Sequence, residues 1–589
     1  MAEILSTSYI NSLIGDYTYN ETDKLITPLT TRKTKYQSLS STFGTLSTKL
    51  SSFKSVLAGL KATEDSSLFG YKSATSSATG FLTASAASNA AAGSYDIRVN
   101  QLAKADVAMS KDLTSTDLSS LSGTHNFVIK TGDGSTGEFV SNIEVSFDGT
   151  ETNKEAMAKI RDAINNDKAV VTSDTKTASG SYSGGAASIK IDLNGTETIV
   201  SLTGGGTYEE LIDEAVEQIN SNVSGVTAEK VSDSGNVSLK LTVNDSSKYI
   251  SISSDSGFDI VSDLNIGVTK EKGASGIVNA SLFSPLTTSS QLSITAKQTG
   301  LDYRITELSD SVGTSLDFLG LNLGVSRPAF DQDQSPDTPG FLYSDITSAG
   351  NLLNSKISFN GLSIQRNSNL VSDLVEGVSF SLKSVMQAED TNVSVTVNTD
   401  VSTIRSKVEG FVKSFNEVYT YIRENSKISS GQRGLFWGDS NTSAVLNILR
   451  SVSYSEVTGL PEGDLKYLSQ LGITFDPSVG LKISDSSALE KKISENTSEV
   501  EAIFNSENGL ANTLYNSLDP YTGSGGYLSN SISSFDQNAK YIDDRITASQ
   551  KRIDKSAEIL RNRYEQLQAQ LAALLSFQSY FNPNSGTYF

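Results

Sequence analysis

Cysteine is absent from the chain, and histidine and tryptophan each occur once in 589 residues. The missing thiols exclude disulfides, zinc–cysteine sites and cysteine nucleophiles. The single histidine, His125, lies in the turn-rich stretch LSGTHNFVIK, where we expect an exposed polar side chain and no catalytic triad. Neither a phosphate-binding glycine motif nor a calcium-binding loop occurs in the sequence. We therefore predict that the protein is not an enzyme and that it has no catalytic or metal-binding residues and no cofactor.

Basic residues are also scarce, because 47 Lys and Arg stand against 67 Asp and Glu and give a formal net charge of −20. This surplus repels nucleic-acid phosphates and anionic lipids, so we predict no nucleic-acid partner and no membrane partner. No apolar run of about 18 residues is present to span a membrane. The first twenty residues lack the basic and apolar regions of a secretory signal peptide, which by itself favours a cytoplasmic protein.

Only 9 prolines occur, and apolar residues make up 37% of the chain, which favours several β-rich modules over one large core. Many stretches between residues 187 and 399 alternate apolar and polar residues around NG and DS turns. They predict antiparallel hairpins in small sandwiches or barrels. Two stretches, 144–165 and 190–220, share a strand, a turn, a helix and a final Ile-Asn pair. We interpret them as an internal duplication, with residues 175–188 as the linker between the copies.

The two ends of the chain carry narrow apolar stripes with a seven-residue repeat. They predict a helix of about 35 residues that starts at Pro28 and a second long helix at the C-terminus. We expect these helices to pair as an antiparallel coiled coil. The alternative, in which each helix packs on its own neighbouring domain, stays open because heptads specify the geometry of a contact and not its partner. The predicted coiled-coil and assembly positions are Leu39, Phe43, Leu46, Leu50, Phe53, Leu57, Ile546, Ile553, Leu560, Leu567 and Leu574.

Helical periodicity also returns after the β-rich middle of the chain. Residues 401–422 place apolar side chains on one face, and 442–455 form a second amphipathic segment. The chain then ends in the aromatic-rich stretch FQSYFNPNSGTYF. Exposed aromatic side chains mark a binding surface, so we consider these aromatics candidates for contact with a chaperone or, equally, with a neighbouring subunit. They are Phe577, Tyr580, Phe581, Tyr588 and Phe589.

Several of these stretches together resemble the flagellar hook-associated protein 2 family, the caps of bacterial flagellar filaments. The N-terminal part of the resemblance comprises residues 25–60 and the stretch AAAGSYDIRVNQLAKAD. The C-terminal part begins with FNGLSIQRNSNLVSDLVEGVSFSLKSV and continues through GDSNTSAVLNILRS to the last helix. The resemblance covers the first 105 residues and the chain from 350 onward, and residues 106–345 depart from it.

The resemblance implies an α+β multidomain protein. Its leg is an antiparallel coiled coil of both termini joined to a discontinuous helical and β leg domain, and its head consists of β-rich domains made of small antiparallel sheets. We predict these segments: 1–65, N-terminal leg helix; 66–105, first part of the leg domain; 106–175, first part of the head; 176–275, inserted or duplicated head domain; 276–397, second part of the head; 398–525, second part of the leg domain; and 526–589, C-terminal helix and tail.

The resemblance also implies a function. Such a protein forms a ring-shaped homo-oligomer, similar to a pentamer, at the distal end of the filament and promotes the folding and insertion of exported flagellin. It implies an extracellular location after type III export without a cleaved signal peptide, in place of the cytoplasm. Implied partners are flagellin, the hook–filament junction proteins and a type III export chaperone. The alternative is a surface adhesin that carries a host-receptor-, mucin- or glycan-binding β head on a coiled-coil stalk.

Overall fold

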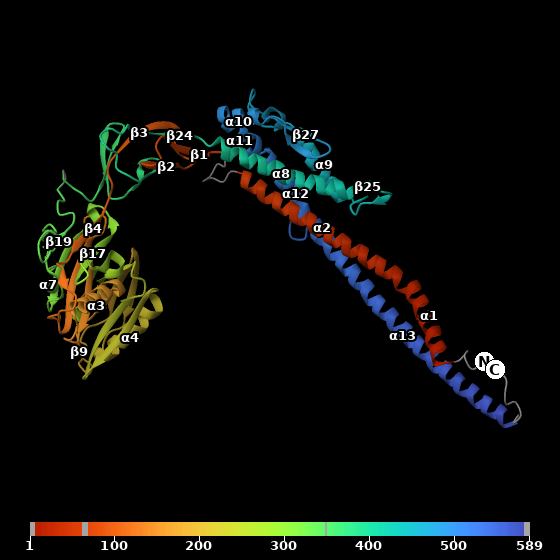
Figure 1. Cartoon of the computed structure of the whole chain (residues 1–589), viewed down its shortest axis with the longest axis horizontal. Coiled ribbons are helices and arrows are strands. Elements are labelled where there is room, and N and C mark those ends of the chain that lie inside the picture. Colours follow the sequence, from red (N-terminus) through yellow and green to blue (C-terminus); the bar gives the residue numbers. More distant parts are fainter. Residues whose placement is uncertain (1–5, 62–68, 348–349, 582–589) are drawn as a thin grey trace. The chain divides into compact units, whose positions relative to one another are not determined.

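The computed structural model describes residues 6–61, 69–347 and 350–581. Contacts divide the chain into two compact units. One unit, which we call the leg unit, joins both ends of the chain, Met1–Ser73 and Thr399–Phe589, and the other, which we call the head unit, is Ala74–Asn398. Helices dominate the leg unit and antiparallel strands dominate the head unit (Figure 1). The predicted α+β multidomain class is thus confirmed.

Amphipathic helices build the leg unit around one apolar core. The second helix begins at Thr27 with Pro28 in its first turn, where a missing N–H costs nothing, and so agrees with the predicted start. Short hairpins, β25 (Ile428–Ser429) with β26 (Gln432–Arg433) and β27 (Ile473–Asp476) with β28 (Gly480–Ile483), join some of the helices. The helices are α1 (Thr7–Leu25), α2 (Thr27–Leu60), α8 (Val401–Ser426), α9 (Ser440–Tyr454), α10 (Ser486–Glu495), α11 (Thr497–Asn505), α12 (Leu510–Thr522) and α13 (Tyr527–Phe581).

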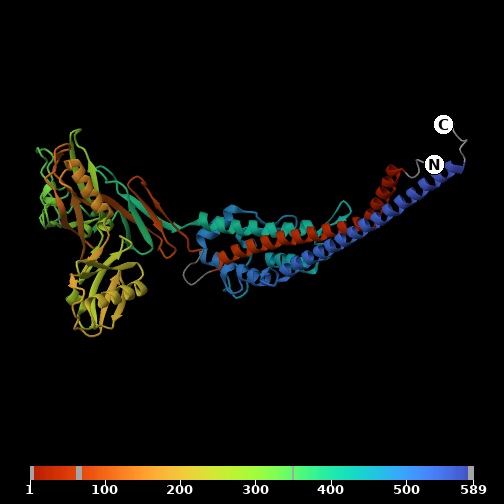
Figure 2. The same ribbon diagram turned by 90° about the horizontal axis from the view of Figure 1, so that it is seen from below.

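The long C-terminal helix α13 lies beside both N-terminal helices (Figures 1 and 2). Lys33 on α2 pairs with Asp543 at 2.5 Å, and Arg561 donates to Asn11 on α1 at 2.7 Å. Because a higher number on α13 meets a lower number on the N-terminal helices, the arrangement is antiparallel. The predicted pairing of the two ends is confirmed, and α2 packs in addition on α8 and α12.

The part of the head unit next to the leg unit in sequence contains two small sheets, ordered β1-β24-β3-β20-β21 and β2-β23-β22. The predicted hairpin around Asn360 and Gly361 is present, and both residues have the positive φ that a two-residue turn needs. We assigned residues 66–105 to the leg domain, but residues from Ala74 onward belong to the head unit because β3 pairs with β20 and β24. The strands are β1 (Lys72–Ser76), β2 (Leu82–Ala86), β3 (Gly93–Gln101), β20 (Ser355–Phe359), β21 (Leu362–Arg366), β22 (Leu370–Val375), β23 (Val378–Leu382) and β24 (Val393–Thr399).

The rest of the head unit contains two copies of one fold, each with its own apolar core. The first, which we call the outer copy, contains β4 (Ala105–Met109), β5 (Leu113–Thr114), β6 (Gly123–Gly132), β7 (Glu138–Phe147), α3 (Asn153–Asn166), α6 (Ala274–Ile277), β16 (Val278–Phe283), β17 (Ser289–Thr299), β18 (Ile305–Val312), α7 (Ser315–Leu319) and β19 (Gly340–Phe341). The second, which we call the inserted copy, contains β8 (Val170–Thr172), β9 (Lys176–Thr177), β10 (Ala187–Leu193), β11 (Thr196–Leu202), α4 (Tyr208–Asn222), β12 (Val226–Asp233), β13 (Asn236–Val243), β14 (Tyr249–Gly257), α5 (Ile260–Leu264) and β15 (Val268–Lys272).

Strand pairing matches between the copies. The order β7-β6-β18 in the outer copy corresponds to β11-β10-β14 in the inserted copy, and β16-β17-β4 corresponds to β12-β13-β8. The corresponding helices, α3 and α4, both start with a capping box. In each, the side chains of a threonine and of the glutamate three residues later accept hydrogen bonds from each other's backbone N–H groups. The inserted copy lies in sequence between α3 and α6 of the outer copy. The duplication is therefore nested.

Side-chain hydrogen bonds repeat as well. Asn165 at the end of α3 exchanges two hydrogen bonds with the backbone of Ala280, each of 2.8 Å. Asn220 on α4 does the same with Ala228, at 2.9 and 2.8 Å. The shared Ile-Asn pair of the sequence is thus a clamp between the helix and the following strand, and the predicted duplication is confirmed.

Three local interpretations of the sequence were wrong. Residues 175–188 form β9 and the start of β10 inside the inserted copy, so they are not a linker. The alternating stretches on the two sides of the DS turn at residues 245–246 predict a hairpin, but they form β13 and β14, which belong to different sheets. His125 lies on β6 and is 5% exposed, because it packs edge-on against Phe147 and its Nδ1 accepts from the Thr314 amide at 3.0 Å.

Candidate assembly surfaces

The predicted positions on α2 form the core of the leg unit. Phe43, Leu46, Leu50, Phe53 and Leu57 are buried, and Leu39 is half-buried against the same core. These side chains contact other helices of their own chain, which leaves them unavailable to a second subunit.

Aromatic contacts show where this α2 stripe packs. The Phe43 ring lies 4.9 Å from the ring of Phe436 and 5.2 Å from that of Phe535 on α13. The Phe53 ring lies about equally far from Phe411 and Phe415 on α8, at 5.9 and 6.0 Å. The narrow stripe therefore serves two partners, α13 at one end and α8 at the other.

The predicted positions on α13 fall into two groups. Ile553 is buried, and Ile546 and Leu560 are half-buried, where α1 and α2 lie alongside. Leu567 is 45% exposed and Leu574 is 66% exposed. Together with Gln570 and Leu571 they line a hollow of about 290 Å³. We call Leu567, Leu571 and Leu574 the distal stripe. Leu567 and Leu574 are predicted seam positions that the described chain leaves exposed, and Leu571 between them is half-buried.

The predicted aromatic tail is described only in part. Phe577 lies on α13 with 66% of its surface exposed. Tyr580 and Phe581 belong to the same helix, and their side chains lie outside the description. Tyr588 and Phe589 lie outside the described residues.

A hollow beside the junction of α1 and α2 was missed by the sequence analysis. The junction brings Lys24 near Arg545 and Arg552 of α13, around a hollow of about 600 Å³. Pro28 and the small residue Ser549 also line this hollow. Lys24 has a weak partner in Glu21, 3.7 Å away. Three cations thus gather on one side of an acidic chain, a clustering that heptad spacing alone does not reveal.

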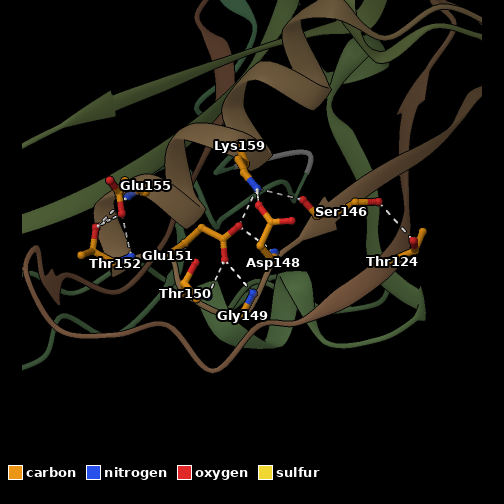
Figure 3. Close-up of polar contacts among 9 residues, drawn as sticks. All are labelled: Thr124, Ser146, Asp148, Gly149, Thr150, Glu151, Thr152, Glu155 and Lys159. Atoms are coloured by element: carbon orange, nitrogen blue, oxygen red, sulfur yellow. Dashed lines mark hydrogen bonds and ion pairs between the residues drawn. The ribbon is translucent and has the colours of Figure 1, made fainter.

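Carboxylates in the head unit also gather in one place, before helix α3 (Figure 3). The Glu151 carboxylate accepts hydrogen bonds from the backbone amides of Asp148, Gly149 and Thr150 at 2.8 to 3.2 Å, and Lys159 pairs with it at 2.5 Å. The Asp148 amide, followed by Lys159, lowers the pKa of Glu151 to about 2. This carboxylate therefore stays ionised and fixes the loop that leads into α3, a structural role that differs from general acid catalysis.

Two segments of the chain match one family of known proteins. These segments include helices of the leg unit and the strands of the two small sheets. Residues 6–106 match the family model described as "Flagellar hook-associated protein 2 N-terminus", and residues 353–574 match "Flagellar hook-associated protein 2 C-terminus". The chain belongs to this family. The two matches agree with the extent of the resemblance predicted from the sequence, and the nested copies of the head unit lie between them.

Curated members of the hook-associated protein 2 family are distant relatives of this chain. The "B-type flagellar hook-associated protein 2" of Pseudomonas aeruginosa is 29% identical over 47% of this chain and 57% of its own length. The "Flagellar hook-associated protein 2" of Salmonella typhimurium is 22% identical over 40% of this chain and 53% of its own length. The chain thus spans little more than half of either relative.

Solved structures of the family are similarly distant. The "flagellar cap protein FliD D1-D2-D3 domains from Escherichia coli" share 19% sequence identity with this chain, cover 84% of it and 99% of their own chain, and give a TM-score of 0.44. No comparison supports the adhesin alternative. Among the helices of the described residues, none is long and apolar enough to cross a membrane.

Proposed function

We propose that this protein is a structural assembly factor that caps the distal end of a bacterial flagellar filament. The proposal rests on one observation: the two segments that match the family's N- and C-termini include α2 and most of α13, which pack into one leg unit. In this proposal a ring-shaped homo-oligomer promotes the folding and insertion of exported flagellin and meets the hook–filament junction proteins. It acts through fitted surfaces and not through reactive groups, outside the cell after type III export.

Labelling at one added cysteine tests this location. Ser234 lies in the exposed turn between β12 and β13. Because the sequence contains no cysteine, a cysteine introduced there is the only thiol that can be labelled. In Ser234→Cys cells treated with an impermeant maleimide dye, we expect one fluorescent spot at the distal end of each filament. The parent chain without cysteine is the matched control and stays dark. Label along the whole filament or over the cell envelope would contradict the proposal.

We further propose that the distal stripe of α13 contacts the export chaperone before assembly and a neighbouring leg afterwards. An exposed apolar helix face needs a partner, and burial of two leucines stabilises a contact by about 3 kcal/mol or more. For Leu567→Ser with Leu574→Ser we therefore expect self-association to weaken about 100-fold or more, as measured by sedimentation.

The neighbouring positions supply a matched control for this variant. Gln566 and Ala573 are also exposed and also seven residues apart on α13. Gln566→Ser with Ala573→Ser introduces the same serines into the same turns and is expected to change nothing. Equal self-association and equal chaperone binding in both double variants would overturn the proposed role of the stripe.

A further inference from the structure

The chain crosses between the outer and the inserted copy twice, and the two crossings touch. The first follows α3 at Asp167, and the second runs from β15 into α6. The Asp167 carboxylate accepts a hydrogen bond from the amide of Ala274 at 2.6 Å, and its backbone oxygen accepts one from the Ser275 hydroxyl at 2.5 Å. A Cβ at Gly273 would lie 2.7 Å from the Asp167 oxygen, so glycine is required for this approach.

A second carboxyl lies on the returning crossing. Glu271 on β15 is 4% exposed and lies opposite Val140, where β15 runs parallel to β7 of the outer copy. Its oxygens accept from the Asn142 amide at 3.2 Å and from Asn142 Nδ2 at 3.1 and 3.0 Å. Glu271 thus ties the inserted copy to the outer copy by neutral donors.

The cations of the neighbourhood bind elsewhere. Lys270 pairs with Asp133, Lys272 lies 4.4 Å from the centre of the Phe139 ring, and Lys297 donates to the backbone of Ser275. Among the residues that the structure describes, no lysine or arginine forms an ion pair with the carboxylate of Asp167 or of Glu271 within 4 Å. Two further charged groups lie near β15, Asp192 beside Lys270 and Asp245 beside Lys272, and both are acidic. The residues that face Glu271 directly are neutral: Ile250 on β14 and Asn142 on β7.

Two carboxyls at one joint, the buried Glu271 and the half-buried Asp167, therefore have no cation in contact among the described residues. Burial raises the pKa of Asp167 to about 7. Burial, with the nearby charge of Asp167, also raises the pKa of Glu271 to about 7. Lys272 follows Glu271 on β15, but its ammonium group lies over the Phe139 ring. Burial and the charge of Lys297 lower its pKa.

We propose that the two crossings form a pH-responsive joint, in which the protonated carboxyls of Asp167 and Glu271 hold the inserted copy against the outer copy and their ionisation releases it. The inference is independent of the cap function. The joint responds to the pH of the surrounding medium because these two carboxyls bind and release protons.

The direction follows from linkage. Both carboxyls bind a proton more tightly in the closed joint than in an open one, where their pKa values return to about 4. Protonation therefore stabilises the closed joint by its full amount below about pH 4, and this stabilisation is lost as the pH rises to about 7. Across that window the ratio of closed to open joint falls by up to about tenfold per pH unit for each carboxyl.

Hydrogen exchange of the purified full chain tests the joint directly. We expect the protection of residues 268–277, corrected for intrinsic exchange, to fall at least about tenfold between about pH 5 and pH 8. Peptides from β13, in the core of the inserted copy, are expected to keep constant protection, which separates opening of the joint from global unfolding. Glu271→Gln and, independently, Asp167→Asn should each reduce the fall.

Glu217 supplies the matched control, because it is an exposed glutamate on α4 of the same copy. Glu217→Gln should retain the full pH dependence of the parent chain. Constant corrected protection of residues 268–277 in the parent, or an unchanged fall in both joint variants, would overturn the proposal. Either joint variant alone suffices for this decision if the other fails to fold.

Discussion

Phe43→Ala is expected to lower the free energy of unfolding of the leg unit by about 3–5 kcal/mol. The Phe43 side chain is 2% exposed and contacts Phe436, Tyr527 and Phe535, so truncation leaves a cavity between α2 and α13 that the surrounding rings cannot fill without shifting. The chain has a single tryptophan, Trp437, next to Phe436 in the same unit. Denaturant titration followed by Trp437 fluorescence therefore reports the leg unit alone.

Leu574→Ala is the control for this prediction. Leu574 belongs to the same predicted heptad pattern, but it is 66% exposed, and its truncation is expected to change the free energy of unfolding by less than about 0.5 kcal/mol. Equal losses for the two variants would mean that the distal stripe is covered within the chain. A small loss for Phe43→Ala would contradict the packing of α13 on α2.

The predictable parts of the leg unit are those that depend on local periodicity. The repeat between Leu39 and Leu57 specifies a helix with one apolar face, and α2 is that helix. The same repeat does not say that one end of this face packs on α13 and the other on α8, because both partners present similar apolar faces. Likewise, Leu567 and Ile553 share one heptad position, yet Ile553 is buried and Leu567 is 45% exposed, a difference that heptad spacing does not specify.

The head unit shows a stricter limit of sequence reasoning. The letters GTET occur at residues 149–152 and again at 195–198. In the outer copy, Thr152 caps α3. In the inserted copy, the same four letters form part of a hairpin turn and the first residues of β11. The shared Ile-Asn pair still indicated the duplication. The segments predicted from the sequence treated 176–275 as inserted or as duplicated. They did not indicate that it is both, because Asn165 finds its partner Ala280 beyond the whole inserted copy.

One candidate site was partly predictable from the sequence, and the other was not. The apolar positions of α13 were predicted from spacing, and the exposure of its distal stripe then singled out two of them. Glu271 and Asp167 gave no signal in an acidic chain, because in the sequence they look like any other glutamate or aspartate. Only the contact between the two crossings sets them apart.

Arg327→Met is expected to destabilise the head unit by about 3–5 kcal/mol. Its guanidinium group donates to both oxygens of Asp106, at 2.8 and 2.9 Å, and the Asp106 side chain is fully buried. The same group donates to the backbone oxygens of Ile305 and Tyr343 and lies 3.9 Å from the centre of the Phe341 ring. Removal of Arg327 leaves a buried carboxylate whose remaining donor is the Ile305 amide, at 2.9 Å.

The double variant Asp106→Leu with Arg327→Met separates charge from packing. Replacement of both charges by apolar groups removes the uncompensated carboxylate, so we expect the double variant to be more stable than Arg327→Met. It remains less stable than the parent, because the Ile305 amide loses its acceptor and the carbonyls of Ile305 and Tyr343 lose a donor. Scanning calorimetry of the full chain measures the head transition, while Trp437 fluorescence verifies that the leg transition is unchanged. Single and double variants with additive losses would contradict a coupled pair and would indicate that Arg327 stabilises the segment after α7 through its backbone and ring contacts instead.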